Sequence, residues 1–282
     1  MADVRQTRAF LAASVPASMD ARWYELSDER GPHGVLQGAQ GRGTGANILA
    51  GIAWMLAGVL AGDSLYLHYS GHGVLSARGD AGELLGRNSL WVPLDYRSFR
   101  GGGERGCISD DELRRQLVEQ VPAGAKLWVT SDSCHSGSML DLRYSVKDAS
   151  GRGTAFGAPG VWQPDPLPSG AAAAPYNPAN RQPATLLTEN KFYPPTAGSV
   201  ILLSGCRDSQ TAADAVLDNQ PTGALTWSFL QCLRANRSAP VKYFLKDVRA
   251  LLVDNGFDQQ PQVSSGGPVD VRTSVMTLLG LG

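Results

Sequence analysis

Apolar positions in the first half of the chain alternate between helical spacing and short continuous runs. From Asn47 to Leu60 they recur every three or four residues, which predicts an amphipathic helix, and the run SLYLHYS at 64–70 predicts a buried strand. Ser109 precedes three acidic residues in a capping-box pattern, which predicts a second helix, and KLWVTSD at 126–132 predicts a second buried strand. Strand, helix and strand within about 70 residues indicate a βαβ unit with parallel strands.

The second half of the chain begins with a change in composition. Residues from about 148 to 197 are rich in Pro, Gly and Ala without periodicity, which predicts a linker or a long surface loop. SVILLSG predicts a third buried strand, and helical spacing follows at about 222–235 and 240–254. We expect SVMTLLG, near the end, to close the sheet as a last strand, and TRAFLAAS, near the beginning, to form a short strand.

Composition favours a globular protein without an extended charged surface. The 25 Lys and Arg residues nearly balance the 26 Asp and Glu residues, so no global field points to nucleic acid and no polybasic run points to a membrane surface. MADVRQTRAF lacks the apolar core of a secretory signal, and NILAGIAWMLAGVLAG is too short and too rich in Gly for a spanning helix. We therefore expect a cytoplasmic protein that binds neither nucleic acid nor membrane. The four cysteines show no C-x-x-C spacing, so we expect free thiols.

Candidate chemistry follows the two predicted strands, in HYSGHG at 68–73 and SDSCHSG at 131–137. Parallel strands place such residues together at their carboxyl ends, so Cys134 and His72 are a candidate nucleophile and base. A glycine on each side of His72 leaves room for a substrate backbone. The small residues after Cys134 predict a turn whose backbone N–H groups could bind an oxyanion. We interpret His68 as a core residue of the strand, His135 as pointing away from the thiol, and His33 as an exposed loop residue.

Five motifs in order, HYSGHG, VPLDY, CISDDEL, DSCHSGSMLDL and LLSGCRDSQTAAD, resemble those of type I metacaspases, which are caspase-fold cysteine peptidases. The resemblance implies the α/β class and a caspase-like, three-layer α/β/α fold with a mostly parallel central sheet. It makes 44–147 a large-subunit-like catalytic region and 198–282 a small-subunit-like region of the same domain. The segment 148–197 is then the linker, and 1–43 a divergent amino-terminal segment.

The resemblance also implies an activity and a specificity. Cys134 would be the nucleophile and His72 its partner, acting through a thioester acyl-enzyme on protein or peptide substrates. Cleavage would follow Arg or Lys, with Asp132 and Ser70 in the first specificity pocket. A carboxylate there can pair bidentately with a guanidinium, although Asp132 could also simply cap the strand end. We expect the protein to act as a monomer.

Calcium is the activator that the resemblance implies. The matching positions are Asp110, Asp111 and Asp141, with Asn88 where the family has an Asp. Hard oxygen ligands suit Ca²⁺, and the Asn carbonyl can serve as one, yet the loss of a charge should weaken the site. For Asp110 and Asp111 the alternative stays open that they only stabilise a helix N-terminus.

Basic residues beside or within the linker are candidate self-cleavage points, or else ordinary surface charges. They are Arg143, Lys147, Arg152 and Lys191.

The amino end departs from the family pattern. The resemblance implies a central apolar strand and, soon after it, a further pocket acid, but only TRAFLAASVP is available and no residue matches the acid. If the strand is missing, an inner strand edge is exposed. The alternative function is therefore a catalytically impaired caspase-fold protein with a non-proteolytic binding or aggregate-handling role. Caspase-like cleavage after Asp has little support, because no Arg stands beside the HYSGHG and SDSCHSG motifs.

Overall fold

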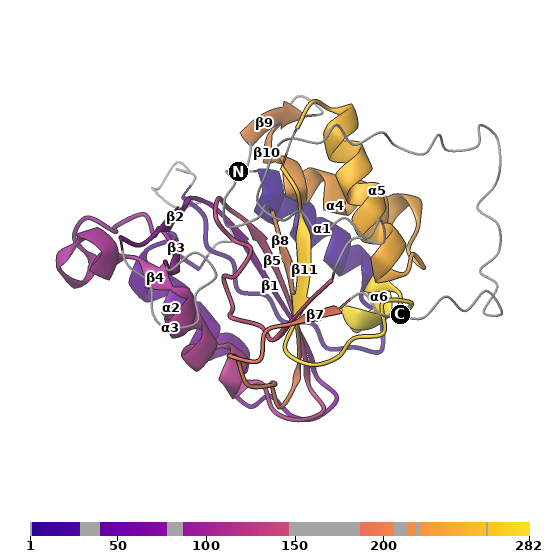
Figure 1. The fold of residues 1–282 in the computed structure, drawn as a ribbon, viewed down its shortest axis with the longest axis horizontal. Helices are drawn as coiled ribbons and strands as arrows, with labels where there is room; N and C mark the ends of the chain where they lie inside the picture. The colour runs from indigo at the N-terminus through magenta and orange to yellow at the C-terminus, as the bar shows by residue number, and fades with distance from the viewer. Residues whose placement is uncertain are drawn as a thin grey trace.

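A computed structural model gives the fold as a central β-sheet between two layers of helices (Figure 1). The structure describes residues 2–28, 40–77, 87–146, 187–205, 214–217, 220–257 and 259–282. The helices are α1 (Ala2–Ser14), α2 (Gly45–Leu56), α3 (Asp110–Gln116), α4 (Ala224–Ala235), α5 (Val241–Asp254) and α6 (Val275–Leu278). In this part of the chain every helix is too short or too polar to cross a membrane.

The central sheet has six strands in the order β1-β5-β8-β11-β6-β7. They are β1 (Ser64–Ser70), β5 (Lys126–Asp132), β8 (Ser199–Ser204), β11 (Gln262–Ser265), β6 (Tyr144–Val146) and β7 (Leu187–Glu189). The pairs β1–β5 and β5–β8 are parallel, whereas β11, β6 and β7 pair antiparallel, so the sheet is mixed. The predicted βαβ unit is confirmed, with β1 and β5 at the predicted residues.

Two smaller sheets lie beside the carboxyl ends of β1 and β5, on opposite sides (Figure 1). One contains β2 (Gly73–Leu75), β3 (Ser89–Trp91) and β4 (Ile108–Ser109). The other is the pair β9 (Asp214–Leu217) and β10 (Gln220–Gly223), which leads directly into α4. The end of the central sheet at which β1 and β5 finish therefore has a small sheet on each side.

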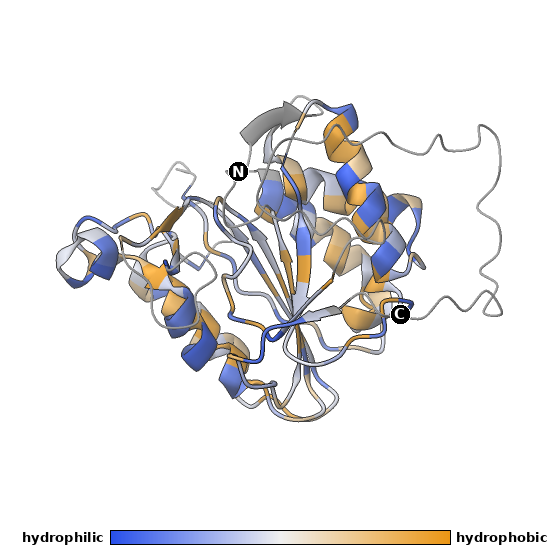
Figure 2. Cartoon of the chain, in the orientation of Figure 1, coloured by the Kyte–Doolittle hydropathy of each residue, from blue (hydrophilic) through white to orange (hydrophobic). Residues whose placement is uncertain are grey.

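The two faces of the central sheet pack on different helices, as alternation along β5 illustrates. Trp128 joins the cluster formed with α1, α4, α5 and α6, whereas Leu127 and Val129 join the cluster formed with α2 and α3. Hydrophobic and hydrophilic residues alternate along α5, as expected for a helix with one face on a sheet (Figure 2). The predicted three-layer α/β/α fold class is confirmed.

The predicted Ser109 cap at the start of α3 is confirmed, although the Glu112 carboxylate bonds to Arg100 and Gln116 instead of completing a capping box. Ser109 is the N-cap, and its hydroxyl accepts a hydrogen bond of 3.2 Å from the backbone N–H of Glu112. The helix begins at Asp110, so the acidic run occupies its first turn.

The strand predicted for TRAFLAAS is wrong, because this segment belongs to helix α1. Its buried residues are Asp3, Thr7, Phe10 and Leu11, which recur at helical spacing. The pattern is visible only when the four residues before the segment are included.

Among the described strands β1 pairs only with β5, so β1 is an edge strand and its side chains are mostly half-buried.

The closing strand predicted for SVMTLLG is wrong as well. Ser274 caps helix α6, and its hydroxyl accepts a hydrogen bond of 3.1 Å from the backbone N–H of Thr277. Local capping therefore outweighs the β-like composition of the segment, and β11 is the last strand of the central sheet instead.

Candidate active site

The ends of β1 and β5 bring the two candidate catalytic segments together. Ser70 on β1 is in register with Asp132 on β5, and His72 and Cys134 each follow two residues later. The backbones are so close after the strands that a Cβ on Gly73 would lie 2.1 Å from the carbonyl oxygen of Cys134. Only glycine fits at this position, because the backbone of Cys134 occupies the space; the room for a substrate backbone around His72 stays a prediction.

The backbone of His72 is held by two hydrogen-bond donors. The hydroxyl of Tyr69 donates to its carbonyl oxygen at 2.9 Å, and the N–H of Val92 donates to the same oxygen at 3.0 Å. The Tyr69 ring stacks on Trp91 with centroids 4.2 Å apart, and burial raises the pKa of Tyr69, so the phenol stays a donor. The His72 side chain itself is exposed. A fixed backbone therefore presents an accessible imidazole.

The segment after Cys134 is a turn, as the small residues predict. The buried hydroxyl of Ser136 donates to the carbonyl of Ser133 at 2.9 Å and accepts from the N–H of Gly205 at 3.2 Å. These bonds tie the turn to the end of β8. The thiol of Cys134 is half-buried, and the residue after it, His135, has a left-handed backbone with φ of 52°.

Asp132 is buried at the end of β5 and contacts the first turn of α4. Its Oδ2 accepts hydrogen bonds from the backbone N–H of Thr226 at 2.8 Å and from the Thr226 hydroxyl at 2.7 Å. The carboxylate thus caps a helix whose own N-cap residue is Gly223. A Cβ at Gly223 would lie 2.1 Å from Oδ2, so glycine is needed for this approach.

A second buried acid, Asp3 on α1, also contacts the start of α4, and the sequence did not reveal it. It accepts hydrogen bonds from the Ser70 hydroxyl at 2.5 Å, from the Gly223 N–H at 3.1 Å and from the Thr222 hydroxyl. Asp3 lies beside Ser70, but it precedes TRAFLAASVP, whereas the further pocket acid was expected after that segment. The sequence signal was the helical spacing of Asp3, Thr7 and Phe10; only TRAFLAAS, which leaves out Asp3, was interpreted as a strand.

His68 lies on β1 close to Asp3, consistent with the predicted place in the strand. Neither ring nitrogen has a hydrogen-bond partner among the described residues. Burial lowers the pKa of His68 to about 4, against the opposing effect of the Asp3 charge. The imidazole is therefore neutral at physiological pH and acts as an uncharged neighbour of the acid. His33 lies outside the described residues.

The predicted calcium ligands form a cluster at the start of α3. Carboxylate oxygens of Asp110, Asp111 and Asp141 all lie within 4.8 Å of one another, and Asp110 and Asp141 are buried. The amide nitrogen of Asn88 donates to Asp111 at 2.6 Å. Such crowding of negative charge suits a hard divalent cation, so these donors fit Ca²⁺. Asp110 also lies in the first turn of α3, where an acid stabilises the helix N-terminus, so the alternative to a ligand role stays open.

The candidate self-cleavage residues differ in their surroundings. Arg143 pairs with Glu189 at 2.8 Å, whereas Lys191 is exposed. Lys147 and Arg152 lie outside the described residues. Cys107, Cys134 and Cys232 form no disulfide, as predicted, and Cys206 is outside the described part of the chain.

Comparison with known proteins gives one consistent family. The model of the metacaspase, peptidase C14 domain matches residues 1–143. Metacaspase-1 of Mycosarcoma maydis is 34% identical over 81% of this chain and 58% of its own length. Metacaspase-1A of Neurospora crassa is 32% identical over 81% of this chain and 51% of its length, and Metacaspase-1 of Saccharomyces cerevisiae is 32% identical over 81% and 55%. The chain thus spans between half and three-fifths of the length of these relatives.

Proposed function

This chain belongs to the metacaspase family, and we propose that it is a cysteine endopeptidase that cleaves peptide bonds after Arg or Lys. The observation that carries the proposal is the close approach of the Gly73 backbone to the Cys134 carbonyl beyond the paired ends of β1 and β5. A half-buried thiol and an exposed imidazole on adjoining segments are what a cysteine peptidase needs.

In the proposed reaction, His72 accepts the proton of the Cys134 thiol and the thiolate attacks the substrate carbonyl carbon. The tetrahedral intermediate then collapses to a thioester as the C–N bond breaks, and the imidazolium gives its proton to the leaving amine. Water, with His72 as the base, hydrolyses the thioester and restores the thiol. Backbone N–H groups of the turn after Cys134 are the proposed donors to the oxyanion.

Specificity for a basic residue rests on the two buried acids. Asp3 and Asp132 both contact the start of α4, and Ser70 donates to Asp3. Both carboxylates would attract a guanidinium or ammonium group of the substrate by their negative charge. A substrate Asp would be repelled by two buried negative charges, which disfavours caspase-like cleavage.

Calcium is the proposed activator, held by Asp110, Asp111 and Asp141 with the carbonyl of Asn88. A bound cation would neutralise the mutual repulsion of these carboxylates. Asp141 lies on the segment that follows the Cys134 turn, and the Arg114 guanidinium donates to its backbone carbonyl. Arg114 thereby holds this segment against α3. We propose that this contact fixes the conformation of the turn that carries Cys134.

The test is a panel of fluorogenic peptides that end in Arg, Lys or Asp, assayed with and without millimolar calcium. We expect cleavage of Arg and Lys peptides that requires calcium and disappears in Cys134→Ala. The matched control is Cys232→Ala, because Cys232 is a second half-buried cysteine whose pKa burial raises to about 12. This variant should retain wild-type activity.

Three outcomes would contradict parts of the proposal. Absence of cleavage by a folded protein would favour the catalytically impaired, partner-binding alternative. Cleavage after Asp would refute the role of the two acids. Equal activity in excess chelator would remove calcium as the activator while leaving the peptidase proposal intact.

A further inference from the structure

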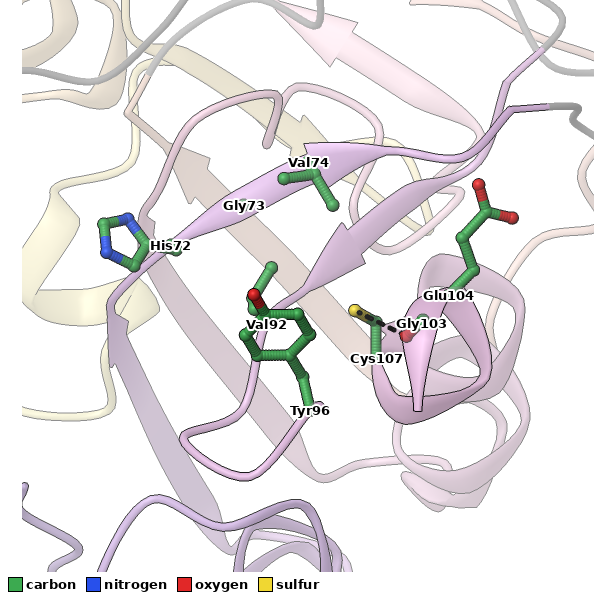
Figure 3. A pocket seen from close by; sticks show the side chains of 8 residues that line it. All are labelled: His72, Gly73, Val74, Val92, Tyr96, Gly103, Glu104 and Cys107. Carbon is green, nitrogen blue, oxygen red and sulfur yellow. Dashed lines mark hydrogen bonds between the residues drawn. The ribbon is translucent and has the colours of Figure 1, made fainter. Parts of the chain in front are cut away.

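A cavity of about 350 Å³ opens beside His72, and neither Asp3 nor Asp132 is among its lining residues (Figure 3). It lies against β2, the segment that follows β3 and the segment that precedes β4. The lining residues are His72, Gly73, Val74, Val92, Tyr96, Gly103, Glu104 and Cys107. Because His72 belongs to both the proposed dyad and the cavity wall, the two are continuous.

The cavity has apolar walls and one anchored charge. Burial and the neighbouring Glu104 charge raise the pKa of Cys107, so its thiol stays neutral. Glu104 accepts a hydrogen bond of 2.7 Å from the backbone N–H of Ala77, which fastens the loop before β4 to the end of β2. The Val74 side chain is 41% exposed, so it offers apolar surface that a ligand could cover.

The cavity lies where the substrate residues after the cleaved bond would bind, an argument that rests on the proposed function. In the proposed complex, a basic side chain bound by Asp3 and Asp132 would lie near the start of α4, which both carboxylates contact. The peptide then passes Cys134 and reaches His72, which protonates the amine of the next residue. The chain beyond the cleaved bond therefore continues toward β2, on the opposite side of the sheet end (Figure 1).

We propose that this cavity is a specificity site for a large apolar side chain within the first two residues after the cleaved bond. Leu or Phe would bury its surface on Val74, Val92 and Tyr96. An acidic side chain would lose water beside Glu104 and be repelled. The preferred substrate then has a basic residue followed closely by an apolar one.

The test uses internally quenched peptides with a single Arg and with Leu, Phe, Gly or Asp at each of the next two positions. We expect kcat/KM to be at least roughly tenfold higher for Leu or Phe than for Gly at one of these positions, with Asp the poorest. Val74→Asp should reduce this ratio to about twofold or less. Val253→Asp is the matched control, because Val253 is 47% exposed on α5, and it should keep the wild-type ratio.

A binding measurement separates this proposal from the proposed function. Fluorescein-labelled peptides of the same panel are titrated onto the Cys134→Ala protein and followed by anisotropy. Coumarin amides of Arg, which have no residue after the bond, test the peptidase activity alone. Cleavage of these amides with a flat panel would overturn the cavity proposal only. No amide cleavage with tighter binding of Leu or Phe peptides would overturn the proposed function and support the cavity. A flat panel in both binding and cleavage would overturn the cavity proposal.

Discussion

Replacing Gly73 with Ala is expected to separate the two proposed catalytic residues while leaving the fold intact. The added Cβ would lie 2.1 Å from the Cys134 carbonyl oxygen and 3.3 Å from the Ser133 Cβ. Contacts of a Cβ below 3.0 Å essentially do not occur, so the two segments must move apart by roughly 1 Å. A misplacement of that size costs about 100-fold in rate when it disturbs reacting groups.

The assay is kcat/KM on an Arg coumarin amide, together with a thermal unfolding curve. We expect the G73A rate to fall by about 100-fold, with a loss of roughly 1–3 kcal/mol in the free energy of unfolding. Gly267→Ala is the matched control, since nothing lies within 4 Å of a Cβ at that position. A G73A protein with a rate within twofold of wild type would refute the inferred closeness of the His72 and Cys134 backbones.

Three further predictions concern the proposed pocket acid Asp3, the proposed calcium ligand Asn88 and the buried His68. Asp3→Asn should lower kcat/KM for Arg peptides by at least roughly 30-fold, because loss of one partner in a buried charge pair costs about 2–5 kcal/mol; an unchanged value would exclude Asp3 from the pocket. Asn88→Asp should tighten calcium binding roughly tenfold or more in calorimetry, because it places another negative charge beside Asp111, and equal affinity would count against Asn88 as a ligand. Between pH 6.5 and about 4 the unfolded chain binds a proton at His68 that the folded chain does not, so stability is lost as pH falls through this window. The loss is roughly 3 kcal/mol in urea unfolding; His68→Leu should remove it, and an unchanged pH slope would contradict this.

Sequence patterns predicted the centre of the site well, because its elements are local. The apolar runs at 64–70 and 126–132 are β1 and β5, and Ser109 caps the start of α3. Each of these signals is complete within fewer than ten residues. His72 and Cys134 come side by side because the strands that precede them are parallel neighbours in a βαβ unit.

The parts that the sequence did not reveal depend on distant partners. The Asp3 carboxylate contacts Ser70, 67 residues away, and Thr222, 219 residues away. Tyr69 looked like an ordinary strand aromatic, yet its hydroxyl holds the His72 carbonyl. TRAFLAAS and SVMTLLG, which were wrongly predicted as strands, contain short apolar runs that fit a strand or a helix equally well. The spacing of buried residues in the first and the Ser274 cap in the second favour the helix.

The contact between α1 and the start of α4 also has a consequence for folding. The thiol and the imidazole follow adjacent parallel strands whose paired residues are 62 apart, for example Ser70 and Asp132. The bond between Asp3 and Thr222 closes a loop more than three times as long, and such contacts of high sequence separation form slowly. A chain that has paired β1 with β5 but has not docked α1 holds both groups of the proposed dyad and only one of the two acids. We therefore expect the proposed pocket for a basic residue to be completed after the proposed reactive pair has formed, late in folding.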